Sequence, residues 1–282
     1  MAGKSLRNLL KRQNHLVFPG AYNPFVAKQI EDFGFPGIYI SGAGLANSLG
    51  VPDDGTLGLE DFLYMGQRIK KAVDIPVICD ADTGFQDIEE TVRRYIEVGI
   101  SALQIEDQVS PKRCGHLAGK EVVTMEEMIE KIQQACATRD RYDWDFTMIA
   151  RTDARGASNI ESKVQLEESI HRGQLYREAG ADIIFPEALQ SKEEFVRYRK
   201  EVAGYLLANM TEFGITPFIK AEEFFDLGFN IVIFPVSLFR YHAGQSVKFL
   251  SQLKEDGNQK HLVQKMMDRK AIHSILNYEP DK

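Results

Sequence analysis

The chain has 282 residues, with 41 acidic and 34 basic side chains, a formal net charge of −7 and three cysteines. Its length allows one large domain or two ordinary ones, and 44% hydrophobic residues supply a sizeable core. The acidic balance excludes a non-specific polyanion binder, because binding to phosphate backbones requires a surplus of Lys and Arg. No run approaches the ~20 apolar residues that span a bilayer. Three cysteines without zinc-ligand spacing indicate a reducing environment, so we expect a cytoplasmic protein.

Short apolar runs rich in β-branched residues recur along the chain and predict eight strands. In chain order they are 15–19, 37–41, 76–81, 102–106, 146–151, 182–186, 205–208 and 230–234. Their residues do not alternate between apolar and polar, which indicates burial on both faces, as in a parallel sheet.

Stretches with helical periodicity separate these runs. They are 24–33, 59–73, 88–98, 125–137, 163–179, 192–202 and 217–227. Thr124 with Glu127, and Ser191 with Glu194, have the spacing of a capping box at a helix start. Eight strands alternating with seven helices predict an α/β fold, a (β/α)8 TIM barrel formed by residues 1–282 as a single domain. A doubly wound open sheet is the alternative, but no G-x-G-x-x-G motif follows an early strand.

Residues 237–282 contain one or two further amphipathic helices beyond those that close a barrel. We expect this C-terminal helical extension to dock against another element or to form an oligomer.

Polar side chains gather at the predicted strand ends, where a (β/α)8 barrel has its active site. These side chains are Ser41, Asp80, Asp82, Glu106, Arg151, Glu187 and Asn209. Asp80 and Asp82 are two residues apart, so on a strand they face the same side. Mg2+ takes one or two carboxylates together with waters and substrate oxygens, whereas zinc would require a His or Cys cluster. We therefore predict Mg2+ at Asp80 and Asp82, with Glu106 acting through water.

The segment between Asp107 and Thr124 is longer than the usual βα loop of about 2–6 residues, which is typical of a lid. It contains Lys112-Arg113-Cys114-Gly115-His116, in which cationic and titratable side chains flank a thiol. Such a setting suits proton exchange with a substrate. An incidental exposed cysteine is the alternative. Cys79 and Cys136 lie in apolar or helical stretches and are predicted to be packing residues.

Five motifs resemble the lyase branch of the isocitrate lyase and phosphoenolpyruvate mutase superfamily, and the methylisocitrate lyase family above all. The motifs are Asp80-Ala81-Asp82-Thr83-Gly84-Phe85, Ile105-Glu106-Asp107-Gln108 with the Cys-Gly-His segment, Ala150-Arg151-Thr152-Asp153, Phe185-Pro186-Glu187-Ala188 and Asn209-Met210-Thr211-Glu212-Phe213-Gly214. The resemblance covers nearly the whole chain. It implies a Mg2+-dependent barrel whose last helix is exchanged between the subunits of a homotetramer.

The resemblance also implies roles for individual residues. Asp80 and Asp82 would be metal-site carboxylates, with Glu106 acting through water, and Cys114 would be the catalytic acid/base. The other implied catalytic residues are Arg151, His116 and Tyr39, the last as a candidate base. Substrate would contact Ser41, Gly42, Ala43, Cys114, Gly115, Arg151, Glu187, Asn209, Met210, Thr211, Arg240 and Arg269.

The implied reaction is a retro-Claisen cleavage of 2-methylisocitrate to pyruvate and succinate, as in propionate catabolism by the methylcitrate cycle. Phe185, smaller than Trp, would leave room for the methyl group. Isocitrate lyases are longer chains, and phosphonopyruvate-forming mutases lack the Cys-Gly-His acid. A relative acting on dimethylmalate, isocitrate or oxaloacetate is the main alternative, and a barrel that only binds a metabolite is the non-enzymatic one. We expect a small carboxylate partner, not a nucleic acid or a membrane.

Overall fold

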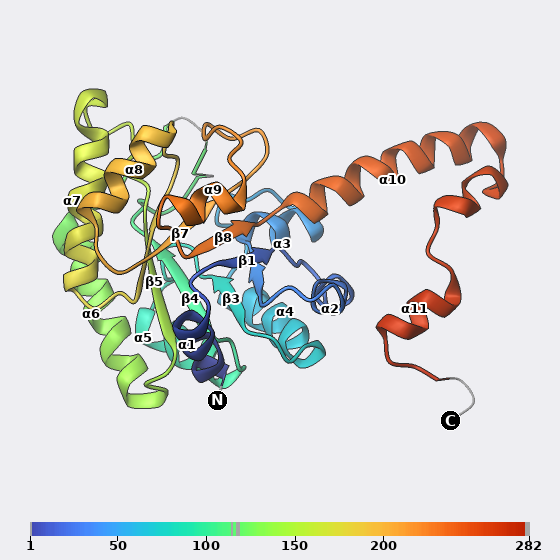
Figure 1. The fold of residues 1–282 in the computed structure, drawn as a ribbon, viewed down its shortest axis with the longest axis horizontal. Coiled ribbons are helices and arrows are strands. Elements are labelled where there is room, and N and C mark those ends of the chain that lie inside the picture. Colours follow the sequence, from blue (N-terminus) through green and yellow to red (C-terminus); the bar gives the residue numbers. More distant parts are fainter. Residues whose placement is uncertain (1, 114, 117–118, 280–282) are drawn as a thin grey trace.

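The structure is a computed structural model that describes residues 2–113, 115–116 and 119–279. Eight strands lie within these residues (Figure 1): β1 (Leu16–Pro19), β2 (Ile38–Ile40), β3 (Val77–Asp80), β4 (Ala102–Glu106), β5 (Thr147–Thr152), β6 (Ile183–Pro186), β7 (Tyr205–Asn209) and β8 (Ile231–Phe234). Their order is β1-β8-β7-β6-β5-β4-β3-β2, and all neighbours are parallel. The eight predicted strands are confirmed.

The sheet curls into a barrel, in which β1 lies between β8 and β2. β1 pairs with β8 along its whole length, from Leu16 opposite Ile231 to Pro19 opposite Phe234. β1 and β2 approach through one bridge between Gly20 and Tyr39. The result is a nearly closed eight-strand barrel, which confirms the predicted fold class and rules out the open-sheet alternative.

Helices surround this barrel: α1 (Ala2–Arg12), α2 (Pro24–Asp32), α3 (Gly42–Ser48), α4 (Leu59–Ala72), α5 (Ile88–Glu97), α6 (Met125–Tyr142), α7 (Gln165–Glu178, after the 3-10 turn Ser162–Val164), α8 (Lys192–Glu201) and α9 (Ala221–Asp226). Thr124 and Ser191 cap α6 and α8 as predicted, because their hydroxyls accept backbone hydrogen bonds from Glu127 and Glu194. α9 begins four residues later than predicted, since the N–H of Ile219 bonds to the sulfur of Met210 instead of entering a helix.

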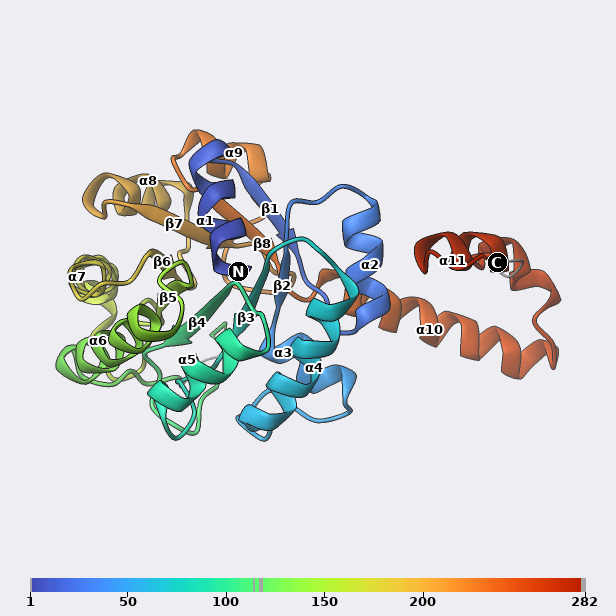
Figure 2. The same cartoon turned by 90° about the horizontal axis from the view of Figure 1, so that it is seen from below.

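Two helices were not predicted. α1 lies over the strands at the N-terminal end of the barrel, where Leu6 and Leu10 are buried among side chains of the barrel interior (Figure 2). α3 begins directly after β2, and Ser41 is its N-cap. Ser41 therefore caps a helix, and Gly42 and Ala43 are the first two residues of that helix rather than the end of a strand.

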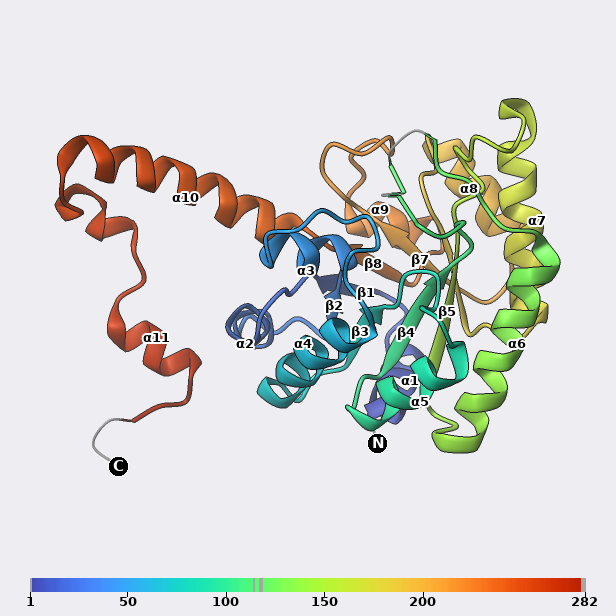
Figure 3. The ribbon, with the colours of Figure 1, turned by 180° about the vertical axis from the view of Figure 1, so that it is seen from behind.

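The C-terminal extension consists of α10 (Ser237–Asp256), a 3-10 turn (Lys260–Lys265) and α11 (Arg269–Ile275). α10 projects away from the barrel, and α11 returns beside it (Figures 1 and 3). None of these three elements has a buried residue, and Tyr241, Val247 and Leu250 of α10 are exposed apolar side chains. Within the described residues, no helix is both long and apolar enough to cross a membrane.

The meeting of β1 and β8 gives a test of the barrel. A β-carbon on Gly20 would lie 1.9 Å from the carbonyl oxygen of Pro235, whereas one on Gly244 of α10 would meet nothing within 4 Å. We expect Gly20→Ala to lower the free energy of unfolding by about 2 kcal/mol, because backbone must move. Gly244→Ala should raise it by about 0.5–1 kcal/mol through helix propensity. Urea denaturation measures both free energies of unfolding. Equal changes in the two variants would contradict the close contact between Gly20 and Pro235.

Candidate active site

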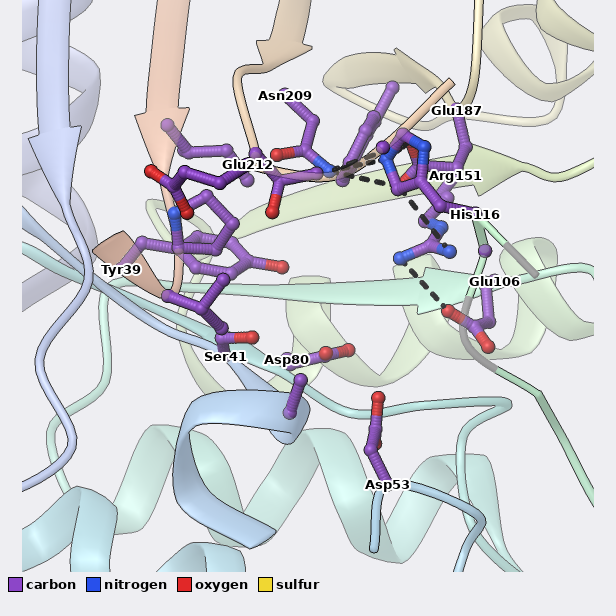
Figure 4. Close-up of a pocket in the computed structure, with 18 of the residues that line it drawn as sticks. Tyr39, Ser41, Asp53, Asp80, Glu106, His116, Arg151, Glu187, Asn209 and Glu212 are labelled. Carbon is purple, nitrogen blue, oxygen red and sulfur yellow. Dashed lines mark hydrogen bonds and ion pairs between the residues drawn. The ribbon is translucent and has the colours of Figure 1, made fainter. Parts of the chain in front are cut away.

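A cavity of about 300 Å³ opens at the C-terminal ends of β2 to β8 (Figure 4). Of the predicted site residues, it is lined by Tyr39, Ser41, Ala43, Asp80, Glu106, Gly115, His116, Arg151, Glu187, Asn209, Thr211 and Arg240. The C-terminal ends of parallel strands lie together at one end of a barrel, so residues far apart in sequence meet there. Strand ends and lid therefore meet in one place, as the sequence predicted.

Four predicted residues do not line the cavity. The N–H of Gly42 already donates to Asp80 Oδ2 at 3.0 Å, and Asp82 pairs with Lys112 without lining the cavity. The sulfur of Met210 faces the N–H of Ile219 instead. Arg269 is exposed at the start of α11, outside the cavity of its own chain.

Cys114 lies outside the described residues, so its predicted role stays a prediction. The residues on either side of it, Arg113 and Gly115, both line the cavity. Cys79 and Cys136 are buried free thiols, as predicted. Burial raises the pKa of Cys136 to about 11 and that of Cys79 well above its usual value, so both remain protonated at neutral pH.

Asp80 and Asp82 lie close together at the end of β3. A β-carbon on Gly42 would be 3.0 Å from Asp80 Oδ2 and 3.1 Å from Asp82 Oδ1, so the two oxygens flank one point. The ammonium of Lys112 lies 2.6 Å from Asp82 Oδ1 and donates to Asp53 Oδ1 at 2.6 Å. Lys112, a cation of the lid, therefore pairs with both Asp82 and Asp53.

These carboxylates have the donor chemistry of a Mg2+ site. Burial raises the pKa of Asp82 to about 7, although Lys112 opposes the shift, and burial also raises the pKa of Glu106 well above its usual value. The Oε1 atom of Glu106 is buried without a hydrogen-bond partner. Among the described residues, no group of three or more Asp, Glu, His or Cys side chains is placed so that it could hold a metal ion by itself. An open set of oxygens is what Mg2+ requires when it keeps waters and substrate as ligands, so the residues fit.

Arg151 is the central cation of the cavity. Its Nε and Nη2 donate to the two carboxylate oxygens of Asp153 at 2.8 and 3.0 Å. Its other contacts are Glu106, at 3.3 Å, and Glu187, at 3.4 Å. The ring of Phe185 lies under the guanidinium, 5.2 Å from its carbon. These contacts fix the direction in which Arg151 faces the cavity.

Glu187, His116 and Asn209 join the lid to the barrel (Figure 4). The N–H of Ile215 donates to His116 Nδ1 at 3.1 Å, so Nε2 bears the proton of the neutral ring and donates to Glu187 Oε1 at 3.0 Å. Asn209 Nδ2 donates to Glu187 Oε2 at 3.2 Å. Burial by itself raises the pKa of Glu187, but Arg151 and the bond from His116 outweigh it and hold that pKa well below its usual value. Glu187 is therefore an ionised acceptor that holds His116 in place.

The lid and the barrel approach each other so closely that two contact positions have room only for glycine. A β-carbon on Gly115 would lie 2.2 Å from Arg151 Nη2, and one on Gly214 would lie 2.8 Å from the ring of His116. At the other end of the lid, the amide of Gln108 bonds to both the N–H and the carbonyl of Arg113 at 2.9 Å. The described part of the lid is thus in a closed arrangement.

Tyr39 and Arg240 complete the cavity. The hydroxyl of Tyr39 donates to Gln104 at 2.6 Å, and burial, followed by the charge of Asp80, raises its pKa well above the usual value. In this environment Tyr39 keeps its proton and acts as a hydrogen-bond donor, not as a base. Arg240 reaches the cavity from α10 and bonds to Thr211 and Glu212, each at 3.0 Å.

Several residues of the site were not predicted from the sequence. Asp53 and Glu212 line the cavity, Gln104 holds Tyr39, and Asp153 orients Arg151. Asp53 lies in the connection between α3 and α4, far from any strand end, so strand-end reasoning could not find it. Asp153 stands in the quoted Ala-Arg-Thr-Asp motif, two residues after Arg151, and that spacing was the available signal.

Comparisons with known proteins agree with this geometry. The model of the phosphoenolpyruvate phosphomutase family matches residues 6–254. The 2-methylisocitrate lyase of Aeropyrum pernix is 44% identical over 98% of this chain and 87% of its own. The chain belongs to the phosphoenolpyruvate mutase/isocitrate lyase superfamily. The 2,3-dimethylmalate lyase of Eubacterium barkeri is another superfamily relative, 39% identical over 97% of this chain and 93% of its own.

Solved structures of superfamily members share the whole fold. A 2,3-dimethylmalate lyase superposes with a TM-score of 0.90 at 35% identity, covering 98% of this chain and 91% of its own. Oxaloacetate acetylhydrolase with 3,3-difluorooxalacetate has a TM-score of 0.90 at 32% identity, covering 98% and 93%. Phosphonopyruvate hydrolase with oxalate and Mg2+ has a TM-score of 0.85 at 30% identity, covering 98% and 95%. The last two of these structures contain small carboxylates, 3,3-difluorooxalacetate and oxalate.

The ionised Glu187 gives a pH-dependent prediction. Its folded-state pKa lies below the usual 4.5, so its contribution to stability is present above pH 4.5 and is lost as the pH falls further. We expect Glu187→Gln to lower the free energy of unfolding at neutral pH by about 2–3 kcal/mol, because a buried ion pair is broken while Arg151 keeps other partners. The deficit should shrink in acid.

Urea denaturation at neutral pH and below pH 4.5 measures this difference for both proteins. Glu178→Gln, an exposed carboxylate on α7, is the control and should show no such pH dependence. A Glu187→Gln deficit that is the same at both pH values would contradict the assigned ionisation.

Proposed function

We propose that the protein is a Mg2+-dependent carbon–carbon lyase that cleaves 2-methylisocitrate to pyruvate and succinate. The observation that supports this most is the convergence of Asp80, Glu106 and Arg151 on one cavity beneath a closed lid. The 44% identity to a 2-methylisocitrate lyase over nearly the full length supports the choice of substrate.

Substrate binding is assigned to the cations and backbone donors of the cavity. Arg151 faces the cavity with its guanidinium fixed by Asp153, and it would hold a substrate carboxylate that gains charge during cleavage. Arg240 and Thr211 would hold a second carboxylate. Ser41 and Ala43, at the start of α3, would contribute hydroxyl and backbone donors. Gly42 is excluded from direct contact because its N–H is bonded to Asp80.

Asp80 and Asp82 would hold Mg2+, and Glu106 would act through water. When bound, Mg2+ supplies Lewis-acid stabilisation of the negative charge on the substrate oxygens. Lys112 adds a further positive charge beside Asp82.

Proton transfer is assigned to the lid. In the cleavage, the 2-hydroxyl loses its proton to water as its oxygen becomes the pyruvate carbonyl, and the electron pair of the broken C–C bond stays on the succinate carbon. Cys114, as the thiol, would donate its proton to that carbon and regain one from water. His116 would hold this part of the lid through its bond to Glu187, and not as a proton donor to substrate, because its Nε2 proton is already shared. A closed lid would keep water from the carbanion.

The alternative substrate is dimethylmalate, because a 2,3-dimethylmalate lyase is similar at 39% identity. Dimethylmalate has two carboxylates, whereas 2-methylisocitrate has three. The cavity is lined by Arg113, Arg151 and Arg240 together with Lys112. Five carboxylates also line it, so the choice of the tricarboxylate rests on the higher identity to the 2-methylisocitrate lyase, 44% against 39%.

We further propose that the C-terminal extension is exchanged between the subunits of a cytoplasmic homotetramer. In the single chain, Tyr241, Val247 and Leu250 are exposed on α10, so they have apolar surface to bury against a partner. Arg269 would then reach the cavity of a neighbouring subunit.

A substrate panel tests the reaction. We expect 2-methylisocitrate to give pyruvate and succinate, and EDTA to abolish turnover until Mg2+ is restored. Isocitrate, which lacks the methyl group, should have a kcat/KM about 10–200-fold lower. Coupled detection of pyruvate and glyoxylate measures both. Turnover that survives EDTA, or a higher kcat/KM for dimethylmalate, would contradict the proposal.

Substitutions in the lid test the proton donor. Cys114→Ser should lower kcat by about 10²–10⁴-fold, the usual contribution of a positioned acid. Gly115→Ala should lower it about 100-fold, because the new β-carbon would lie 2.2 Å from Arg151 Nη2 and displace the lid. Gly58→Ala, which adds the same methyl group in open space outside the C-terminal extension, is the control. Wild-type kcat in Cys114→Ser would contradict the assigned acid.

A further inference from the structure

Lys120 is a buried cation that the proposed mechanism does not use. It lies after the tip of the lid, and only 1% of its surface is exposed. Its carbonyl accepts bonds from the N–H and the hydroxyl of Ser158, at 2.7 and 3.0 Å. Its ammonium donates to Asp153 Oδ1 at 3.0 Å. Burying a lysine costs free energy unless it is paired, so Asp153 is the partner that makes this burial tolerable.

Asp153 is held from three sides. Its N–H donates to Asp107 Oδ1 at 2.7 Å. Asp107 in turn accepts bonds from Tyr176 at 2.8 Å and Arg172 at 3.1 Å, both on α7. The carboxylate of Asp153 accepts two bonds from Arg151 and one from Lys120. Neither Asp153 nor Lys120 lines the cavity, so neither contacts a ligand there.

The charges around Arg151 explain why a second cation is needed. Asp153, Glu106 and Glu187 all contact the single guanidinium of Arg151. Three carboxylates around one cation would leave a negative region that repels an anionic ligand. Lys120 supplies positive charge to Asp153, the one carboxylate of the three that does not line the cavity.

We propose that Lys120 is a positioning residue for Arg151: it pairs with Asp153, fixes the carboxylate that orients the guanidinium, and leaves Arg151 able to bind a carboxylate anion. This inference rests on the proposed function only in taking a small carboxylate as the ligand. Lys120 and Asp153, which do not line the cavity, would therefore influence the affinity for the ligand.

Oxalate binding in the presence of Mg2+ tests this without turnover. We expect Lys120→Met to weaken oxalate binding at least tenfold by calorimetry, and to raise KM for 2-methylisocitrate more than it lowers kcat. Lys120→Arg keeps the positive charge but is larger, so it should weaken oxalate binding less than Lys120→Met does. Lys70→Met is the matched control: its half-buried ammonium bonds to the carbonyls of residues 73 to 75, outside the cavity, so oxalate binding should not change.

A double-mutant cycle keeps the test valid if Lys120→Met is unstable. Asp153→Asn removes the charge that Lys120 neutralises, so adding Lys120→Met to it should cost much less oxalate affinity than Lys120→Met alone. Equal losses in both backgrounds would overturn the proposal. So would wild-type oxalate affinity in Lys120→Met, which would leave Lys120 a structural residue only.

The two proposals fail separately. If oxalate affinity depends on Lys120 but 2-methylisocitrate is not cleaved, the substrate assignment is wrong and the positioning role stands. If 2-methylisocitrate is cleaved with unchanged KM in Lys120→Met, the positioning role is wrong and the reaction stands.

Discussion

The site depends on one buried cation, Arg151, that must remain available to a ligand while it contacts three carboxylates. Asp153 takes two of its donor groups, and Glu106 and Glu187 lie beside the others. A buried guanidinium is stable only with such partners. Without additional positive charge, these three carboxylates would fully neutralise Arg151. Lys120, which pairs with Asp153, supplies the additional charge.

Closure of the lid is governed by the same side chain. Gly115 can lie against Arg151 only because it has no β-carbon. His116 is fixed at the same time, since its proton goes to Glu187 and its other nitrogen accepts from Ile215. The lid position, the orientation of Arg151 and the ionisation of Glu187 are therefore coupled, and a change in one is expected to appear in the other two.

The eight strands were predictable because each is a short apolar run buried on both faces, such as β5. The strand-end rule also located Asp80, Glu106 and Arg151, because parallel strands of a barrel end at one mouth. The two unpredicted helices differ in their local signals. α1 is strongly amphipathic, with Leu6 and Leu10 on its buried face, so its periodicity was an available signal. α3 begins with small residues directly after β2 and has little signal.

By itself, the sequence determined the order of strands and helices and the residue types that meet at the barrel mouth. Only the tertiary structure decided how those residues pair. It placed Asp53 beside Lys112, bonded Gly42 to Asp80, and left Arg269 outside the cavity of its own chain. The physical reason is that periodicity and burial are local properties of a chain, whereas ion pairs and close approaches depend on distances between segments far apart in sequence.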